Sequence, residues 1–516
     1  MTAPRNINPW LIATAVMFAT FMEVLDTTVV NVSLPHIAGS LSSTIDEATW
    51  ALTSYLVANA IVLPMTGWLA SIFGRKNLLL WATAGFTITS FLCGIAPTLW
   101  SLILFRILQG ATGGVLQPLS QAVLLESFAP HDRGKAMAFW GLGIVVAPIL
   151  GPVVGGWLTD TYSWRWVFYI NLPVGIASII MTRLYVFDPP YIQAVKRGID
   201  YWGLGLLVLG IGALQIVLDK GQEDDWFSSS FILALAVIAA VALICLLVHE
   251  YFAEDPVIDL RIFRERTYAV GVFMMTIVGF VLYGSMVLLP IMLQTLLGYP
   301  ALQAGIAMAP RGMGSFLMMP IVGILTSKVD TRKLLAVGLA VGGTTMIWLG
   351  QLSLSAGYWD IFWPQFVQGA GMALMFVPLT TVSMSLIPRE KIGNATSLFN
   401  LMRNIGGSIG IAVTGTMLAR QRQSFSAVLG EHVSVYDPTT LGVLEQAKAA
   451  FMAAGADVTT ATARAYAAVN GMLIRQATMV SFVTLFRLLG VLFFIVIPLV
   501  LIMRRPKGPG GPVGAH

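Results

Sequence analysis

Charged residues are scarce in this chain. Only 11% of its 516 residues are Asp, Glu, Lys or Arg, whereas an ordinary soluble domain has roughly 25%. A soluble fold needs more polar surface than this, so the composition excludes a soluble enzyme, a nucleic-acid-binding protein and a disordered chain. The formal net charge of +5 is typical of the basic cytoplasmic loops of a membrane protein and predicts no nucleic-acid partner.

Cysteine and clustered histidine are missing as well. The two cysteines, Cys93 and Cys245, lie in apolar runs and predict neither a disulfide framework nor a metal site. The five histidines are scattered over loops and chain ends, unlike the convergent cluster of a membrane-embedded enzyme. The sequence also has no ATP-binding P-loop of the form GxxxxGKS or GxxxxGKT, which excludes a primary pump. We therefore expect neither an enzyme nor a cofactor.

Long apolar runs are abundant, and hydrophobic residues make up 57% of the chain. A helix needs about 20 apolar residues to cross a bilayer. On this measure the chain is an all-α, multi-pass membrane protein with fourteen predicted spans. The spans are 10–33, 49–72, 77–97, 99–123, 136–158, 165–187, 200–219, 229–251, 268–291, 301–326, 333–354, 360–384, 396–419 and 479–503.

The distribution of Lys and Arg predicts the orientation. With the N-terminus in the cytoplasm, nearly all Lys and Arg of the short loops fall on the cytoplasmic side, and the short outer loops contain only Arg165 and Lys220. An even number of spans then places both termini in the cytoplasm. Residues 420–477 form one long outer loop of mixed charge, in which 441–454 is predicted to be a polar helix outside the membrane.

An internal repeat divides the chain. Residues 67–76 (GWLASIFGRK) close the second span, and the similar residues 323–333 (GILTSKVDTRK) close the tenth. Gln109-Gly110 in the fourth span is echoed by Gln368-Gly369 in the twelfth. We therefore predict a six-helix half at 1–190, two inserted spans at 191–265 and a second six-helix half at 266–516. Repeated halves with a site between them are the architecture of secondary transporters.

A few charges lie inside predicted spans, where burial is costly and a functional role is expected. Asp26 lies about 24 Å and Glu23 about 20 Å along the first span from Trp10, and Arg106 lies about 9 Å from the outer face in the fourth. The three side chains are thus at similar depths. Two neighbouring carboxylates next to an arginine can load and release a proton, so they are the predicted proton-coupling residues. A static ion pair between two helices is the alternative.

Polar side chains also recur on the fourth span, at Gln109, Gln117 and Gln121. A polar stripe of this kind faces either a cavity or another helix. With Asn31, Tyr55 and Asn59 on the first two spans, these residues are our candidates for the lining of a substrate cavity.

The fifth span combines small residues with two prolines. Gly143, Ala147, Gly151 and Gly155 recur every four residues and allow close helix packing, while Pro148 and Pro152 permit a kink. We expect this helix to slide against a partner during transport, although static packing would give the same pattern.

Together these motifs resemble the major facilitator superfamily, and within it the fourteen-span drug:proton antiporters of the EmrB/QacA type. The resemblance rests on residues 25–35 (LDTTVVNVSLP), 67–76, 106–110 (RILQG), 147–156 (APILGPVVGG) and 164–173 (WRWVFYINLP). It implies that Arg106 takes part in proton coupling. It also implies conformational roles for Gly67, Gly74, Arg75 and Lys76 in the loop motif, and for Pro148, Gly151, Pro152, Gly155 and Gly156 in the antiporter motif. Ser71 departs from the loop motif, which usually has an acid at this position.

The resemblance predicts a proton-coupled efflux antiporter for hydrophobic or amphiphilic drugs in the bacterial inner membrane, with lipid around it. The long outer loop resembles that of members which work with a periplasmic adaptor protein and an outer-membrane channel. The alternative is a proton-coupled uptake symporter for a small nutrient, against which the fifth-span pattern argues. We expect Asp26→Asn to abolish coupling and Glu23→Gln to have a smaller effect.

Overall fold

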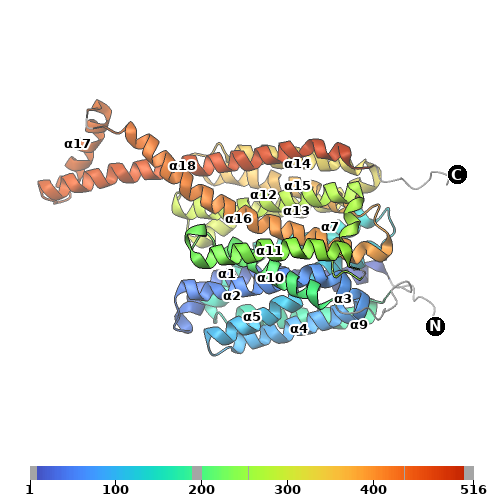
Figure 1. The fold of residues 1–516 in the computed structure, drawn as a ribbon. Coiled ribbons are helices and arrows are strands. Elements are labelled where there is room, and N and C mark those ends of the chain that lie inside the picture. The colour runs from blue at the N-terminus through green and yellow to red at the C-terminus, as the bar shows by residue number, and fades with distance from the viewer. Residues whose placement is uncertain (1–7, 189–199, 254, 435, 505–516) are drawn as a thin grey trace, which may run out of the picture.

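A computed structural model describes residues 8–188, 200–253, 255–434 and 436–504, and within these ranges the chain is helical without strands (Figure 1). The α-helices are α1 Pro9–Ser40, α2 Ile45–Val62, α3 Thr66–Phe73, α4 Arg75–Ile95, α5 Leu99–Gly113, α6 Leu116–Ser127, α7 Arg133–Thr161, α8 Trp166–Tyr169, α9 Asn171–Tyr185, α10 Tyr201–Lys220, α11 Ser230–Phe252, α12 Arg266–Thr295, α13 Ala301–Lys328, α14 Thr331–Leu349, α15 Tyr358–Ser383, α16 Ile392–Glu431, α17 Pro438–Ala453 and α18 Val458–Val496. Short 3-10 turns are η1 Leu63–Met65, η2 Trp226–Ser228, η3 Leu260–Arg264, η4 Arg389–Lys391 and η5 Ile497–Ile502.

Among the described residues, 12 segments are helical, long and apolar enough to cross a membrane. Helix α7 makes 13 if its two parts, which meet at a bend of 42° between Pro148 and Val153, count as one span. The chain is therefore a multi-pass membrane protein. The predicted span 396–419 lies in α16, which does not pass the same test because Asn400, Arg403 and neighbouring Gly, Ser and Thr residues make it too polar. The fourteen predicted spans are thus not all recovered on composition alone.

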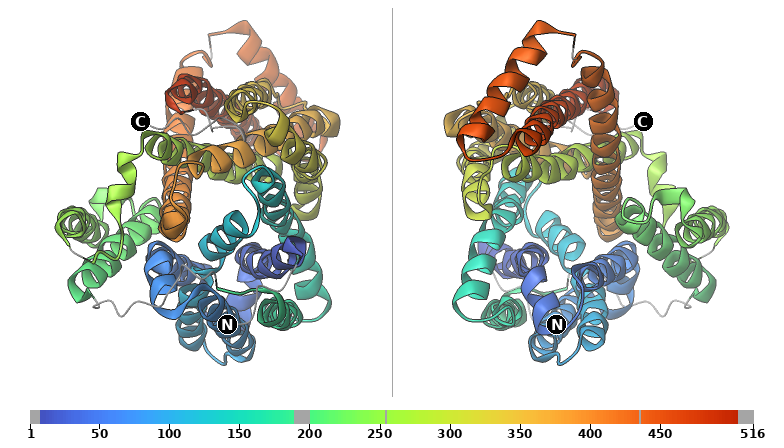
Figure 2. Two further views of the ribbon diagram at one scale, coloured as in Figure 1. Left: turned by 90° about the vertical axis from the view of Figure 1, so that its right-hand side faces the viewer. Right: turned by 90° about the vertical axis from the view of Figure 1, so that its left-hand side faces the viewer.

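Seen end-on, the helices form two groups (Figure 2). Helices α1 to α9 lie on one side and α12 to α18 on the other, while α10 and α11 lie at the edge, where α10 contacts both groups and α11 packs on α10. On the first group, Lys220 donates to Thr49 Oγ1 at 2.5 Å. On the second, the Gln215 amide donates to Ser408 Oγ at 3.0 Å and the Trp226 indole to Thr416 Oγ1 at 3.0 Å. Helix α10 therefore joins the two groups along one side.

The two groups pack tightly at the end of the bundle where α1 begins and α18 finishes (Figure 1). Here α3 lies against α16, and a Cβ added at Gly67 would be 2.8 Å from Asn394 Cα. Helix α7 also lies close to α13, where a Cβ added at Gly323 would be 3.1 Å from Lys135 Cα. Trp140 stacks on Phe376 just inside this contact, with ring centroids 6.1 Å apart. Because no side chain separates the backbones at the glycines, this end is closed.

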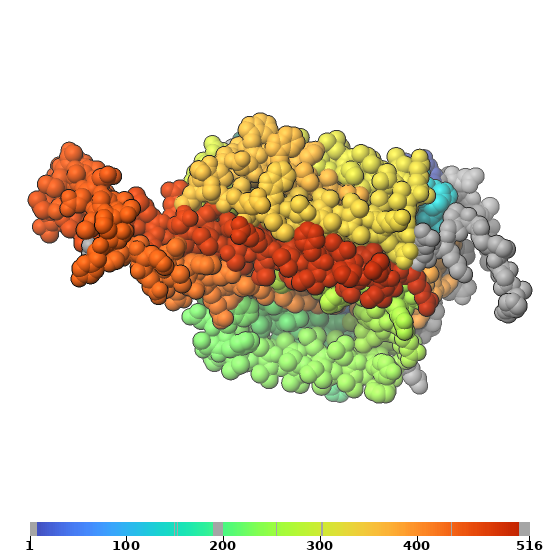
Figure 3. All heavy atoms as spheres, turned by 90° about the horizontal axis from the view of Figure 1, so that it is seen from above, coloured from blue at the N-terminus to red at the C-terminus, as the bar shows by residue number. Residues whose placement is uncertain are grey.

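Three helices project from the opposite end (Figures 1 and 3). Helix α16 continues to Glu431, α17 occupies Pro438–Ala453, and α18 starts at Val458 before it enters the bundle. The predicted polar helix at 441–454 is thus confirmed, but the surrounding 420–477 is largely helical and not a loop. The reason is that α16 and α18 continue beyond the bundle as helices, α16 as far as Glu431 and α18 from Val458 through an Ala-rich sequence. The Asp437 carboxylate caps α17, and its hydrogen bond from Thr440 lowers the pKa of Asp437.

Candidate functional site

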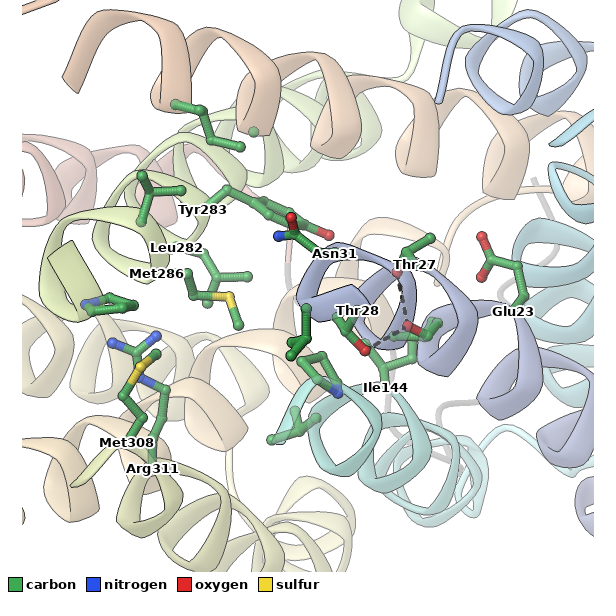
Figure 4. A pocket seen from close by; sticks show the side chains of 18 of the residues that line it. Glu23, Thr27, Thr28, Asn31, Ile144, Leu282, Tyr283, Met286, Met308 and Arg311 are labelled. Carbon is green, nitrogen blue, oxygen red and sulfur yellow. Dashed lines mark hydrogen bonds between the residues drawn. The ribbon is translucent and has the colours of Figure 1, made fainter. Parts of the chain in front are cut away.

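A cavity of about 1130 Å³ lies between the two groups of helices (Figure 4). Helices α1, α2, α6 and α7 form one wall, α12, α13, α15 and α16 form the other, and α10 contributes Gln215. The cavity reaches the exposed side chains of His36 and Asp160 at the end of the bundle that carries α17. Since the other end is closed, the cavity is reached from one end of the bundle only.

Glu23 of α1 lies on the cavity wall and is only 4% exposed. Its carboxylate accepts hydrogen bonds from the Asn59 amide at 3.1 Å and from the Gln117 amide at 2.6 Å, and the Tyr55 hydroxyl lies at 3.5 Å. All three neighbours act as donors toward the carboxylate. Two α2 residues and one α6 residue thus hold a buried acid at the cavity surface.

The same cluster crosses from one group of helices to the other. Gln117 donates to Glu23 through its amide nitrogen, while its amide oxygen accepts a hydrogen bond from the Arg403 guanidinium of α16. Arg403 also donates to Asn404 Oδ1 at 3.2 Å and lies 5.9 Å from the Phe376 ring centroid. A carboxylate on one half is therefore connected through one amide to a cation on the other half.

Asp26 and Arg106 form a second cluster that is sealed from the cavity. Their contact is a salt bridge with 2.5 Å between Asp26 Oδ2 and Arg106 Nη1, and both side chains are fully buried. Asp26 also accepts hydrogen bonds from Asn171 at 2.7 Å and from Gln109 at 3.1 Å. The Arg106 guanidinium stacks over the Tyr55 ring at 4.1 Å. The predicted trio of Glu23, Asp26 and Arg106 thus divides into a cavity acid and a buried ion pair.

Four of the six candidate cavity residues line the cavity, namely Asn31, Tyr55, Asn59 and Gln117. Gln109 and Gln121 do not, and here the prediction was wrong. Gln109 binds Asp26 within the sealed cluster, and Gln121 accepts from Asn400 of α16 at 2.6 Å. The break at Gly114 and Val115 separates Gln109 on α5 from Gln117 on α6. Gln121 lies one turn beyond Gln117 on the same helix, where its contact with Asn400 places it between α6 and α16 and not on the cavity wall.

The loop motif lies at the closed end. Gly74 has a φ of 78°, which favours glycine, and it ends α3 directly before α4. Asp188 accepts the backbone N–H groups of Arg75 at 2.8 Å and Lys76 at 2.9 Å. The Arg75 side chain forms a buried ion pair with Glu126, and Lys76 donates to the Arg183 carbonyl at 2.8 Å.

Ser71, at the position where an acid is usual, donates to the Trp68 carbonyl of its own helix at 2.7 Å. It therefore makes no charge pair. The acids that hold this motif are Glu126 of α6 and Asp188 after α9, both from the same group of helices. Close contact of Gly67 with Asn394, and not an ion pair of residue 71, joins α3 to the other group.

The small face of α7 packs on α1. Gly151 lies against Thr28 and Gly155 against Val29, while Gly156 and Pro148 line the cavity. The side chain of Pro152 lies outside the described part of the structure. The partner of this face is thus a helix of the same half, so movement of α7 would be transmitted directly to the helix that carries Glu23.

We expect Gly151→Leu to impair transport while substrate binding persists. Any side chain here would overlap Thr28, and overpacking commonly costs about 1–3 kcal/mol. That is enough to disfavour one state without unfolding the protein. The control is Gly205→Leu on α10, since a Cβ at Gly205 meets nothing within 4 Å. Transport at the wild-type rate by both variants would contradict this prediction, because it would show that the α1–α7 contact accommodates a larger side chain.

The cavity wall also includes Arg311, Arg403 and Gln215, which were not among our candidate site residues. The sequence contains a signal for both arginines, because a charged residue inside a predicted span indicates a functional role. Gln215 had none, since a single glutamine in an inserted span does not reveal which helix it faces. Of the methionines of α12, Met286 lines the cavity, whereas Met274, Met275 and Met292 are buried in the protein core. Within the described ranges, no three His, Cys, Asp or Glu side chains are grouped to hold a metal ion.

Comparison with known proteins agrees with this architecture. The family model of the Major Facilitator Superfamily matches residues 16–411. The multidrug export protein EmrB of Haemophilus influenzae is 41% identical over 84% of this chain and 86% of its own length. The EmrB of Escherichia coli strain K12 is 39% identical over 97% of both chains. In fold, the chain is similar to the human organic anion transporter MFSD10, with a TM-score of 0.61, 12% identity, and coverage of 95% of this chain and 100% of that one. The chain is therefore a transporter and not an enzyme, and it belongs to the EmrB-type family of the Major Facilitator Superfamily.

Proposed function

We propose that this protein is a proton-coupled multidrug efflux antiporter that exports hydrophobic or amphiphilic compounds by alternating access. The observation that carries the proposal is the position of Glu23, a titratable acid on the wall of a large cavity and linked through Gln117 to Arg403 on the other half. The names of the EmrB relatives, which describe multidrug export, support the substrate class.

The proposed mechanism uses the hydrogen bonds of Glu23. A proton that enters from the cavity mouth neutralises this carboxylate and turns one of its oxygens into a donor. This new donor then faces the Gln117 amide nitrogen, which is also a donor, so the hydrogen bond between them is lost. The connection from Glu23 through Gln117 to Arg403 is thereby weakened. The two halves are then freed to change state. Release of the proton on the other side restores the chain, while an ionised Glu23 attracts a cationic drug.

In this mechanism Asp26 and Arg106 have a supporting role. Their salt bridge joins α1 to α5 about one helical turn from Glu23, and it fixes the position and orientation of the Glu23 side chain. Asp26 has no contact with the cavity in this state, so Glu23 is the residue that exchanges a proton here. Asp26 becomes a second carrier only if the α1–α5 contact opens in the other state.

The membrane arrangement belongs to the same proposal. We place the protein in the bacterial inner membrane with both termini in the cytoplasm, as the positions of Lys and Arg favour. Fourteen spans, as in the EmrB/QacA type, require that α16 and the bent α7 each cross the membrane. The two six-helix halves are then residues 1–190 and 266–516, with α10 and α11 inserted between them. The cavity mouth faces the periplasm, so the structure is an outward-facing state.

The test is transport by the purified protein in proteoliposomes with an imposed pH gradient. An antiporter releases protons from the energised lumen when drug is added, and it moves drug and protons in opposite directions. A symporter would move both in the same direction. Absence of any drug-induced proton movement, in liposomes where the drug is transported, would reject proton coupling.

A further inference from the structure

Arg311 of α13 lies on the wall of the cavity opposite to Glu23 and is only 4% exposed (Figure 4). Its Nε donates to Gln365 Oε1 at 3.0 Å. Neither Nη1 nor Nη2 has a hydrogen-bond partner among the described residues. A buried cation without a counter-charge is costly, and arginine presents its two terminal nitrogens in the geometry that binds a carboxylate. The two terminal nitrogens of this buried cation are thus available to donate hydrogen bonds to a bound ligand.

The internal repeat shows why Arg311 has no acid beside it. With Gly67 aligned on Gly323, Arg311 takes the place of Tyr55. With Gln109 aligned on Gln368, Gln365 takes the place of Arg106. Each half therefore contains one arginine at the same two-helix contact, on α5 in the first half and on α13 in the second.

The difference lies in the helix that faces this contact. In the first half, α1 supplies Asp26 to neutralise Arg106. With Pro35 aligned on Pro290, the α12 counterparts of Glu23 and Asp26 are Val278 and Val281. The second half has thus kept a buried arginine at the contact and has no carboxylate from α12 to pair with it.

The surroundings of Arg311 are apolar. Met308 lies one turn before it on α13, and Met286 of α12 lines the same part of the cavity. Methionine side chains adapt to ligands of different shape. The arginine nitrogens and the thioether walls together match a molecule with one anionic end and an apolar body.

We propose that Arg311 is an anion subsite, which binds the carboxylate of anionic amphiphilic substrates while their apolar part lies against Met286 and Met308. The inference rests on the proposed function and adds a substrate class to it. Anionic substrates bind at Arg311 on α13 and cationic ones near Glu23 on α1, at opposite walls of one cavity.

The test is equilibrium binding to the full-length protein in lipid nanodiscs, with empty nanodiscs as the blank for partition into lipid. The probes are decanoate and decyltrimethylammonium, which share a chain length and differ in head-group charge. We expect R311Q to weaken decanoate binding by about tenfold or more, since two charge-assisted hydrogen bonds are lost, and to leave decyltrimethylammonium binding unchanged. R311K should keep part of the affinity, because lysine is a point charge without the planar fork.

A second variant keeps Arg311 and provides its guanidinium with a carboxylate from the protein itself. Met308→Glu places a carboxylate three residues before Arg311 on the same helix face, within reach of its nitrogens. It should also weaken decanoate binding, even if R311Q does not fold. Equal loss of both probes in R311Q, or unchanged decanoate binding in both variants, overturns the proposal. Competition by acetate at the concentration of decanoate would show a site for small anions only and would overturn it too. If the wild type transports neither probe nor any drug, the proposed function itself fails.

Discussion

Replacing Glu23 with glutamine is expected to abolish drug-induced proton movement while the protein still folds and binds neutral drugs. Glutamine has the size of glutamate, but one of its two terminal atoms is a donor. It therefore copies the protonated acid permanently. The Gln117 amide, which now donates to Glu23 at 2.6 Å, must turn or withdraw, and Arg403 then loses its acceptor. Proton release from energised proteoliposomes on addition of drug is the measurement.

Asp26→Asn is the comparison that separates a proton carrier from a structural charge. This change leaves the fully buried Arg106 without its counter-charge, and breaking a buried pair typically costs about 3–5 kcal/mol. We expect a lower melting temperature, which Glu23→Gln should not show. The double variant Asp26→Asn with Arg106→Gln removes both charges and should recover most of that stability. Normal proton release by Glu23→Gln, together with loss of release by the stable double variant, would reverse the proposed roles.

This ranking of the two acids differs from the one that the sequence predicts. Their depths along the first span are well estimated from the helical rise, and that places both beside Arg106. Which acid faces the cavity depends on the rotation of α1, and α1 is apolar on every side, so no hydrophobic pattern fixes its rotation. The contact of Asp26 with Asn171 of α9 decides the question, and no local pattern predicts a contact between residues 145 positions apart.

The fourth span shows a second limit. Helical spacing predicts that Gln109, Gln117 and Gln121 share a face, and this holds only while the helix is continuous. The Gly113-Gly114 pair at its middle is visible in the sequence, and glycine pairs are a known cause of broken helices. A prediction that treats α5 and α6 as separate helices would have kept Gln117 in the cavity without assigning Gln109 to it. It would still have assigned Gln121, because that residue lies on α6 with Gln117 and only its contact with Asn400 of α16 removes it from the cavity wall.

Motifs were the more reliable guide to packing. The four-residue spacing of small side chains on the fifth span predicts a close helix contact, and Gly151 and Gly155 lie against Thr28 and Val29 of α1. The spacing says nothing of which helix is the partner. It also leaves open whether the contact slides, because a fixed and a moving interface both need small residues.

Removing the projecting hairpin is expected to abolish drug resistance of whole cells and to leave transport across the inner membrane intact. The parts of α16 and α18 beyond the bundle, with α17 between them, share no residue with the cavity wall. Arg475 donates to the Leu296 carbonyl at the end of α12, which marks where α18 joins the bundle. A Cβ at Gly430 would be 3.9 Å from Leu473, so about residues 431–472 can be replaced by a short Gly-Ser linker without straining either helix.

We expect this result because the sequence resemblance predicts a partner for the hairpin, a periplasmic adaptor that continues the path to an outer-membrane channel. Without it, substrate is released into the periplasm and returns. The measurements are drug uptake by everted vesicles, growth of a pump-deleted strain on drug, and recovery of a tagged adaptor with each form of the protein. The hairpin has exposed polar side chains together with the exposed aromatic side chains of Tyr436 and Tyr466, and such a surface is suited to contact with another protein. Equal adaptor recovery and equal resistance with the full-length and shortened proteins would show that the hairpin is a tolerated surface extension.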